Sequence, residues 1–453
     1  MNYTGVALSA ASDINVKEVL LPLALILIFS KILSLLGKKI GLPQVIGMIV
    51  VGILLGLIRL IPNEGLFTES ALEGLSFIAE IGVLLIMFSA GIGTDIKQFK
   101  QIGLPSVVIT VMGVLCPLGL GFLVAAGFLH GTITQLDHSA LLSSLFYGTI
   151  LAATSVSITV AALKELGKLN SKIGMSIVAA AIIDDIIGVI LLSLFISLEQ
   201  SGGAGDIGKS IGMMIAFFAA AIAVGIIFRI LIKYISKRHP HTRRIPILGF
   251  AMCFFFAYAA EEWFGVADIT GAYIAGLLLA GISESEYMDK KIEVSNYLIF
   301  APVFFANIGI ANADQYAGMT GAMVGFGFCF ILAGIAGKLI GCGAGALICG
   351  YGVKDSLRVG IGMMVRAEVV LVCAQKGVDA GMVDPTIMPF VLLLIIITTL
   401  LTPMLLKFSY RHEHNSLPPL DGNGGGSASS DVPETADVQT QSDCTNLSVK
   451  QAE

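Results

Sequence analysis

Long apolar runs follow one another almost without interruption from residue 18 to residue 408. A helix needs about 20 apolar residues to cross the hydrocarbon core of a bilayer, and most of these runs are of that length. Over the whole chain 56% of the residues are hydrophobic and 13% are charged, against about 25% charged in ordinary soluble domains. The sequence therefore predicts an all-α integral membrane protein. It excludes a soluble enzyme or a nucleic-acid-binding protein for this region, and continuous rather than alternating apolar runs disfavour a β-barrel.

The runs divide into about thirteen predicted helices, at 18–36, 43–61, 75–91, 103–129, 141–163, 173–198, 211–235, 245–264, 269–281, 296–311, 318–350, 359–375 and 386–407. Of the 27 basic residues, Lys338 and Arg366 lie inside spans and Lys450 lies in the tail, which leaves 24. Twenty of these fall in loops on one side, and four fall on the other side: Lys17, Arg59, Lys209 and Lys376. Because basic loops stay in the cytoplasm, this bias predicts an extracellular N-terminal segment (1–17), a cytoplasmic C-terminus and an odd number of crossings.

The composition changes abruptly after Arg411 to Ser, Gly, Thr, Asp, Gln and Pro. Such a segment cannot bury a core, so residues 409–453 are predicted to form a disordered cytoplasmic tail. The seven cysteines show no CxxC or Cys/His spacing, and no nucleophile–base pair is visible. We therefore expect no disulfide framework, zinc site, cofactor or catalytic residue. The first residues lack a basic region before an apolar run, so a cleaved signal peptide is not expected.

Two adjacent aspartates, Asp184 and Asp185, lie in the middle of predicted helix 173–198 with no basic residue beside them in the sequence. A charge at a helix centre costs about 2.5 to 3.5 kcal/mol on insertion scales, so such a residue is a candidate for function. Neighbours on a helix point about 100° apart. One aspartate can therefore meet a fixed partner while the other lines a water-filled cavity.

Lys338 is the predicted partner, because it lies in predicted helix 318–350 among glycines and alanines that let another helix approach closely. An ion pair with Lys338 engages one aspartate, so the second has no counter-charge. A spare buried carboxylate can exchange a proton for a small cation, since both are positive ligands for the same oxygens. The alternative is a buried ion pair that only fixes helix packing.

Two segments indicate broken helices, which mark the midplane site of many transporters. The first, within predicted helix 141–163, places four hydroxyls mid-span: Thr154, Ser155, Ser157 and Thr159. Ordinary helix packing is an equally good explanation of these hydroxyls. The second, within predicted helix 359–375, places Gly360 and Gly362 beside Arg366 and Glu368. Residues two apart do not face each other on a regular helix, so an irregular backbone accommodates this charge pair more easily.

Taken in order, these motifs resemble the sodium/hydrogen exchanger family of the bacterial cation:proton antiporter superfamily, over about residues 18–408. The segments that carry the resemblance are 41–47, 52–56, 80–91, 153–156, the Asp184–Asp185 pair, 271–276, Lys338, 366–368 and 398–403. Singly these motifs are weak, and in this order they are specific.

The resemblance implies an inverted-repeat antiporter fold with two discontinuous helices and an elevator mechanism. Within the transmembrane domain (18–408), core helices of about 103–198 and 318–407 would move against dimerisation helices of about 18–91 and 245–311. It also implies a homodimer in the lipid bilayer of the bacterial cell membrane.

The implied activity is secondary active antiport of a monovalent cation, Na+ or alternatively K+, against protons, with Asp185 binding the transported cation and the proton competitively. A paired aspartate and lysine is similar to the electrogenic members of the family. The implied site residues are Asp184, Asp185, Thr154 and Ser155 for the cation and proton, with Lys338, Arg366 and Glu368 compensating charge.

The chain departs from the family pattern at Val365-Arg366-Ala367-Glu368, where many relatives read Pro-Arg-Gly-Glu. We expect Gly360 and Gly362 to supply the unwinding slightly earlier. The residues leave open two other classes of function: a K+ efflux channel-like protein, and a sensor or structural membrane protein. Against the channel, no repeated selectivity-filter loop is visible.

Overall fold

The computed structural model describes residues 15–39, 44–59, 61, 65–94, 103–131, 136–155, 159–160, 162–163, 166–169, 171–200, 207–238, 244–311, 313 and 320–414. The chain divides into two units, Met1–Tyr410 and Arg411–Glu453. The first unit holds all the transmembrane segments discussed below. The predicted disordered tail lies mostly outside the described residues, although the last helix continues through its expected start at 409 to His414.

The regular elements of the described ranges are all helical. They are α1 (Val16–Lys39), α2 (Gln44–Arg59), α3 (Glu69–Ile92), α5 (Leu104–Leu129), α6 (His138–Ala152), α8 (Lys172–Gln200), α9 (Ile207–Arg238), α10 (Arg244–Tyr258), η1 (Ala259–Trp263), α11 (Asp268–Leu279), α12 (Ser285–Ser295), η2 (Asn296–Phe300), α13 (Ala301–Ala311), α15 (Gly321–Ile348), α16 (Val353–Gly362), α17 (Glu368–Asp379), η3 (Pro385–Ile387) and α18 (Met388–His414).

Nine helices of the described part are long and apolar enough to cross a bilayer, and α2, α6 and α11 are shorter apolar helices. Helices of these lengths satisfy every backbone polar group within the segment, which a bilayer requires. The protein is therefore an all-α integral membrane protein. Each of the thirteen predicted ranges is occupied by helix, but the number of crossings stays a prediction.

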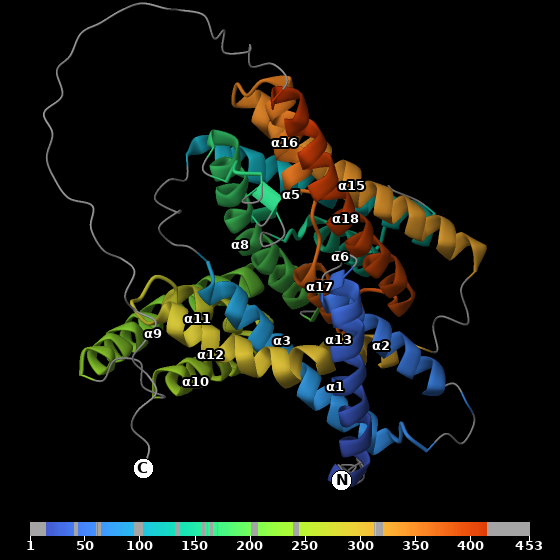
Figure 1. The fold of residues 1–453 in the computed structure, drawn as a ribbon, viewed down its shortest axis with the longest axis vertical. Helices are drawn as coiled ribbons and strands as arrows, with labels where there is room; N and C mark the ends of the chain where they lie inside the picture. The colour runs from blue at the N-terminus through green and yellow to red at the C-terminus, as the bar shows by residue number, and fades with distance from the viewer. Residues whose placement is uncertain are drawn as a thin grey trace, which may run out of the picture. The chain divides into compact units, whose positions relative to one another are not determined.

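The helices of the first unit pack in two groups, as their mutual contacts show. The first bundle contains α5, α6, α8, α15, α16 and α17, joined by α18, and it occupies the upper part of Figure 1. The second bundle contains α1, α2, α3, α10, α11, α12 and α13, in the lower part of the same view. Helix α9 contacts α8, α10 and α11, and α8 also touches α11. Contacts between the two bundles therefore run mainly through α8, α9 and α11, and an ion pair between Lys376 of α17 and Asp268 of α11 adds to them.

Close packing between α15 and α5 depends on glycines of α15. A Cβ added at Gly337 would lie 2.6 Å from Cα of Pro117, and one at Gly341 would lie 2.4 Å from the carbonyl oxygen of Met112. Small residues at such an interface let two backbones approach closely, which is a main source of helix association in membranes. This packing carries Lys338 into the interior of the first bundle, where its side chain is 0% exposed.

Gly337→Ala should lower the thermal stability of the purified protein, because its new methyl group overlaps the backbone of Pro117. Overpacking of this kind costs about 1 to 3 kcal/mol. The matched control is Gly119→Ala, since a Cβ at Gly119 on α5 meets no atom within 4 Å. Melting temperatures measured in the same detergent should fall for Gly337→Ala and stay unchanged for Gly119→Ala. Equal melting temperatures for both variants would contradict the account of this interface.

The helix breaks lie close to where the sequence indicates them. Helix α6 ends at Ala152, residues 153–155 are not helical, and helix is present again at 159. Ser157 lies outside the described residues. The second break runs from 363 to 367, between α16 and α17. Gly360 was expected to supply this unwinding, but it lies inside α16 and packs against the backbone of Leu339. Gly362 is the last residue of α16, directly before the break.

Candidate functional site

The two unwound segments meet each other in the interior of the first bundle. The backbone N–H of Ser155 donates to the carbonyl oxygen of Val365 at 3.0 Å, and the hydroxyl of Thr159 donates to the carbonyl oxygen of Gly362 at 2.7 Å. Unwinding leaves backbone groups without helical partners, and each unsatisfied group in the bilayer costs several kcal/mol. Each segment therefore supplies hydrogen bonds that the other has lost.

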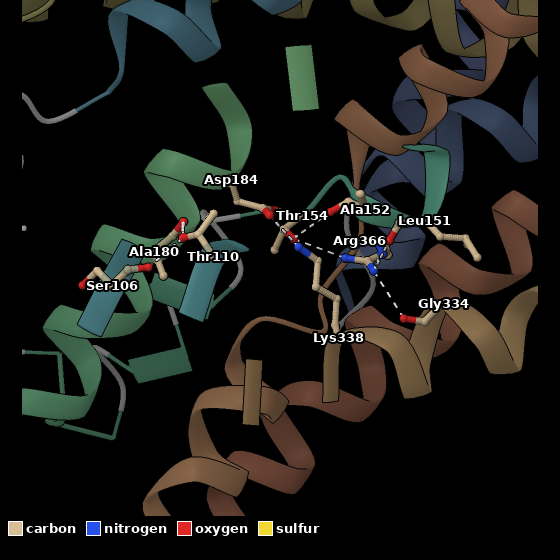
Figure 2. A network of polar contacts seen from close by, with 10 residues as sticks. All are labelled: Ser106, Thr110, Leu151, Ala152, Thr154, Ala180, Asp184, Gly334, Lys338 and Arg366. Atoms are coloured by element: carbon tan, nitrogen blue, oxygen red, sulfur yellow. Dashed lines mark hydrogen bonds and ion pairs between the residues drawn. The ribbon is translucent and has the colours of Figure 1, made fainter. Parts of the chain in front are cut away.

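Arg366 completes this crossing, and its side chain is fully buried. Its guanidinium donates to the carbonyl oxygen of Leu151, to that of Gly334 at 3.3 Å and to the hydroxyl of Thr154 at 3.3 Å, as Figure 2 shows. Leu151 lies in the last turn of α6, where carbonyl groups carry partial negative charge. The cation of Arg366 thus stabilises the exposed end of a broken helix. Within the described part of the chain it makes no ion pair with Glu368, so these two charges do not compensate each other by contact.

Two threonines of α18 hold the backbone of Arg366 in place. The hydroxyl of Thr398 accepts a hydrogen bond from the N–H of Arg366 at 3.2 Å, and the hydroxyl of Thr399 donates to its carbonyl oxygen at 3.2 Å. These bonds explain how the break forms without the Pro and Gly that many relatives have on either side of this arginine. Ala367, which follows, has φ −151° and ψ −135°. The threonines lie in the 398–403 motif that supports the family resemblance, but sequence reasoning assigned them no role.

Asp184 and Lys338 form the ion pair that the sequence predicts. The ammonium nitrogen of Lys338 lies 2.6 Å from Oδ1 of Asp184, and both side chains are 0% exposed. In Figure 2 the pair lies beside Thr154 and Arg366, so the pair from α8 and α15 adjoins the crossing point. A buried pair of opposite charges satisfies the larger part of each partner's need for a counter-charge. The second oxygen of Asp184, Oδ2, is buried without a hydrogen-bond partner among the described residues.

Asp185 is placed differently from its neighbour. It makes no hydrogen bond and no ion pair to any residue that the structure describes, and its Oδ1 is buried. The side chain as a whole is partly exposed. The charged groups that act on it are two carboxylates, Asp184 and Glu368, and the ammonium of Lys338. Among the described residues no cationic side chain contacts this carboxylate to offset its charge.

The remaining predicted site residues lie at the two helix breaks. Thr154 and Ser155 are 1% and 3% exposed, in the unwound stretch after α6. Glu368 is the first residue of α17, where the positive end of a helix dipole favours a negative charge. Thr110 of α5, which no sequence pattern singles out, donates to the carbonyl oxygen of Ala180 at 2.8 Å and so joins α5 to the helix that carries both aspartates.

Comparison with known protein families identifies the family to which this chain belongs. Residues 24–409 match the family described as "Sodium/hydrogen exchanger, transmembrane". The chain belongs to the sodium/hydrogen exchanger family. The matched region includes all of the two bundles except the start of α1 and the end of α18, both helix breaks and all the predicted site residues. This exchanger is therefore a multi-pass membrane protein of the cation:proton antiporter superfamily.

Individual relatives agree with this placement of the exchanger. It is 31% identical to the Na(+)/H(+)-K(+) antiporter GerN of Bacillus cereus, over 87% of this chain and 96% of that protein. It is 33% identical to the probable Na(+)/H(+) antiporter GerT of the same organism, over 80% of this chain and 91% of that protein. Its fold is similar to that of the sodium proton antiporter MjNhaP1 of Methanocaldococcus jannaschii, with a TM-score of 0.62 and 19% identity over 88% of this chain and 98% of that one.

Proposed function

We propose that this exchanger is a secondary active antiporter of a monovalent cation against protons, with Na+ as the first candidate and K+ as the alternative. The observation that carries the proposal is that two neighbouring aspartates differ in their partners. Lys338 engages Asp184, whereas Asp185 is left with a buried oxygen and no partner among the described residues. Relatives named as Na+/H+ and Na+/H+-K+ antiporters support this assignment.

The transport cycle that we propose follows from the net charge of the site in each of its states. Asp184 and Lys338 together carry no net charge, so the empty site has the single negative charge of Asp185. Moving that charge past an apolar barrier is costly. A bound proton or a bound cation neutralises it, and we expect crossing only in these two states. Protons moving down their gradient then drive the cation in the opposite direction.

The oxygens near Asp185 supply a coordination shell for the transported cation. A hard cation prefers oxygen ligands, and the candidates are the carboxylates of Asp185 and Asp184 with the hydroxyls of Thr154 and Ser155. Oδ2 of Asp184, which has no hydrogen-bond partner among the described residues, supports this set. Exchange of one proton for one cation at Asp185 alone would be electroneutral. We nevertheless expect electrogenic transport with more than one proton per cation, as the aspartate pair with a lysine implies for similar family members, and this requires Lys338 to release a second proton when the cation binds.

The two bundles suggest how the site reaches both sides of the membrane. We propose that the first bundle is the mobile core of an elevator and that the second bundle forms the dimerisation domain of a homodimer. The grouping of helix contacts supports this division, since the residues of the candidate site lie in the first bundle. We expect the protein to lie in a bacterial cell membrane with its N-terminus outside and its C-terminus in the cytoplasm.

Flux measurements in proteoliposomes distinguish antiport from a channel-like pathway and from a sensor or structural role. Net uptake of 22Na+ or 86Rb+ (as a K+ tracer) against the cation's own gradient should saturate with concentration and should require an opposing pH gradient. Collapsing the pH gradient with a protonophore should stop it. Cation flux that persists downhill without any pH gradient would contradict antiport and favour a channel-like pathway. An absence of any cation-dependent flux would favour a sensor or structural protein.

A further inference from the structure

An ion pair outside the candidate site joins the two bundles. The ammonium nitrogen of Lys376 on α17 lies 2.8 Å from Oδ1 and 2.9 Å from Oδ2 of Asp268 on α11. The two side chains are only 20% and 17% exposed. Partial burial weakens screening by water, so this pair contributes more than an exposed surface pair. Lys376 is also one of the four basic residues that the charge pattern places on the extracellular side.

A second polar contact between the bundles lies two residues further along α11. The hydroxyls of Ser193 on α8 and Thr270 on α11 are hydrogen-bonded, and both side chains are buried. Three residues beyond Thr270, the buried phenol of Tyr273 interacts electrostatically with Asp185. The first turns of α11 therefore carry polar side chains from Asp268, at the end that the charge pattern predicts to be extracellular, toward the neighbourhood of the candidate site.

Two cavities adjoin the Lys376–Asp268 pair. One cavity of about 160 Å³ is lined by both members of the pair, by Glu261 and by Ile196 of α8. Another is lined by Lys376 together with Glu80 and Gln375. Both cavities are bordered by residues of both bundles, so they mark the outer end of the seam along which the bundles would have to separate.

We propose that the Lys376–Asp268 ion pair, with the Ser193–Thr270 contact beneath it, is the outer gate of this exchanger. This inference rests on the proposed alternating-access function. Both contacts close the extracellular route to Asp185 in the present conformation, and both must break when the first bundle moves to open that route.

The surroundings of Lys376 allow such a gate to open. Besides Asp268, the acidic groups that face it are Asp379 on its own helix, with Glu261 and Glu80 from the second bundle. A lysine released from Asp268 therefore keeps negative neighbours and does not become an uncompensated buried charge, which would be costly. The ion pair can thus hold the gate closed without making the open state inaccessible.

The test measures how readily the seam opens in intact bacteria that express the full chain. Ile196→Cys places a reporter in the cavity next to the pair, at a residue that is 7% exposed. Its rate of labelling by a membrane-impermeant maleimide added outside reports opening, and the parent chain with its native cysteines gives the background. Asp268→Asn and Lys376→Gln should each raise the rate about fivefold, the upper range for loss of such a pair.

Charge exchange and a matched control make the test specific. The double variant Asp268→Lys with Lys376→Asp should return the labelling rate to within about twofold of the reporter protein, because an ion pair is again present. Lys209→Gln, the same change at an exposed lysine of α9, should leave the rate unchanged. Single variants that label no faster than the reporter protein would overturn the gate, and so would a charge-exchanged variant that labels as fast as they do.

Failure of the gate and failure of the proposed function give different results. Asp185→Asn can be inactive in transport while the labelling rate of the reporter cysteine is the same with and without the substitutions at Asp268 and Lys376. In that case the gate inference alone is wrong. If Asp185→Asn still transports, the proposed function is wrong whatever the labelling shows.

Discussion

Asp185→Asn should reduce cation-driven proton movement in proteoliposomes by at least about thirtyfold. The loss of a buried charge partner typically costs about 2 to 5 kcal/mol, and each 1.36 kcal/mol corresponds to a factor of ten in rate. Asparagine has nearly the same shape as aspartate but cannot carry the negative charge that the cation and the proton compete for. The rate is measured as dequenching of a pH-sensitive dye when NaCl or KCl is added.

The same variant should fold normally, which separates loss of transport from loss of structure. Asp185 makes no hydrogen bond or ion pair within the described residues, so the substitution removes an unbalanced charge and breaks no contact. Its melting temperature should equal or exceed that of the wild type. Glu262→Gln, the same chemical change at an exposed residue, should leave transport intact. Transport by Asp185→Asn at a rate within a few fold of wild type would rule out Asp185 as the binding carboxylate.

Lys338→Gln should strongly destabilise the protein, because it leaves Asp184 buried without its counter-charge. Removing one partner of a buried pair costs about 3 to 5 kcal/mol, whereas removing both partners is often close to neutral. Asp184→Asn introduced together with Lys338→Gln should therefore restore most of the lost stability. The measurement is the melting temperature of the four proteins of this double-mutant cycle in one detergent. A double variant that is no more stable than Lys338→Gln alone would show that the pair does not carry this stability.

The same cycle reports on the charge moved during transport. If Lys338 contributes to electrogenic exchange, the voltage generated by the folded double variant should fall relative to its rate of cation uptake. A voltage-sensitive dye and a tracer flux measured on the same proteoliposomes give this ratio. An unchanged ratio would exclude Lys338 as a determinant of the charge stoichiometry.

Much of the fold could be predicted because the bilayer imposes it. Each apolar run is long enough to cross or nearly cross the membrane, and a helix is the conformation that satisfies its backbone there. The pairing of Lys338 with Asp184 was predictable for a similar reason: an isolated charge inside a helix bundle needs a partner, and glycines such as Gly337 and Gly341 mark where helices approach closely.

Contacts that depend on irregular backbone could not be predicted. Arg366 and Glu368 are neighbours in the sequence, and composition gives no sign that Arg366 binds the carbonyl groups of Leu151 and Gly334 instead of a carboxylate. Thr398 is an ordinary hydroxyl residue of an apolar run until the break at 363–367 brings a backbone N–H to it. Such bonds follow from the three-dimensional path of the chain, which periodicity does not encode.

The ion pair of Lys376 with Asp268 was equally hidden. From the sequence, Lys376 is one of four basic residues predicted on the extracellular side of the membrane. Lysines near a membrane surface are usually solvated, so no ion-pair partner was expected. Its partner lies on another bundle, 108 residues earlier in the chain. Local patterns determine which residues lie near a membrane surface, but they do not determine which of two helix groups a surface residue faces.

The most direct test of competition at Asp185 is the release of protons from purified protein when a cation is added. In a weakly buffered detergent solution, NaCl or KCl should displace protons from the wild type in a saturable manner, and the release should be absent in Asp185→Asn. An equal release from the variant, or cation binding by the wild type without any proton release, would contradict the account.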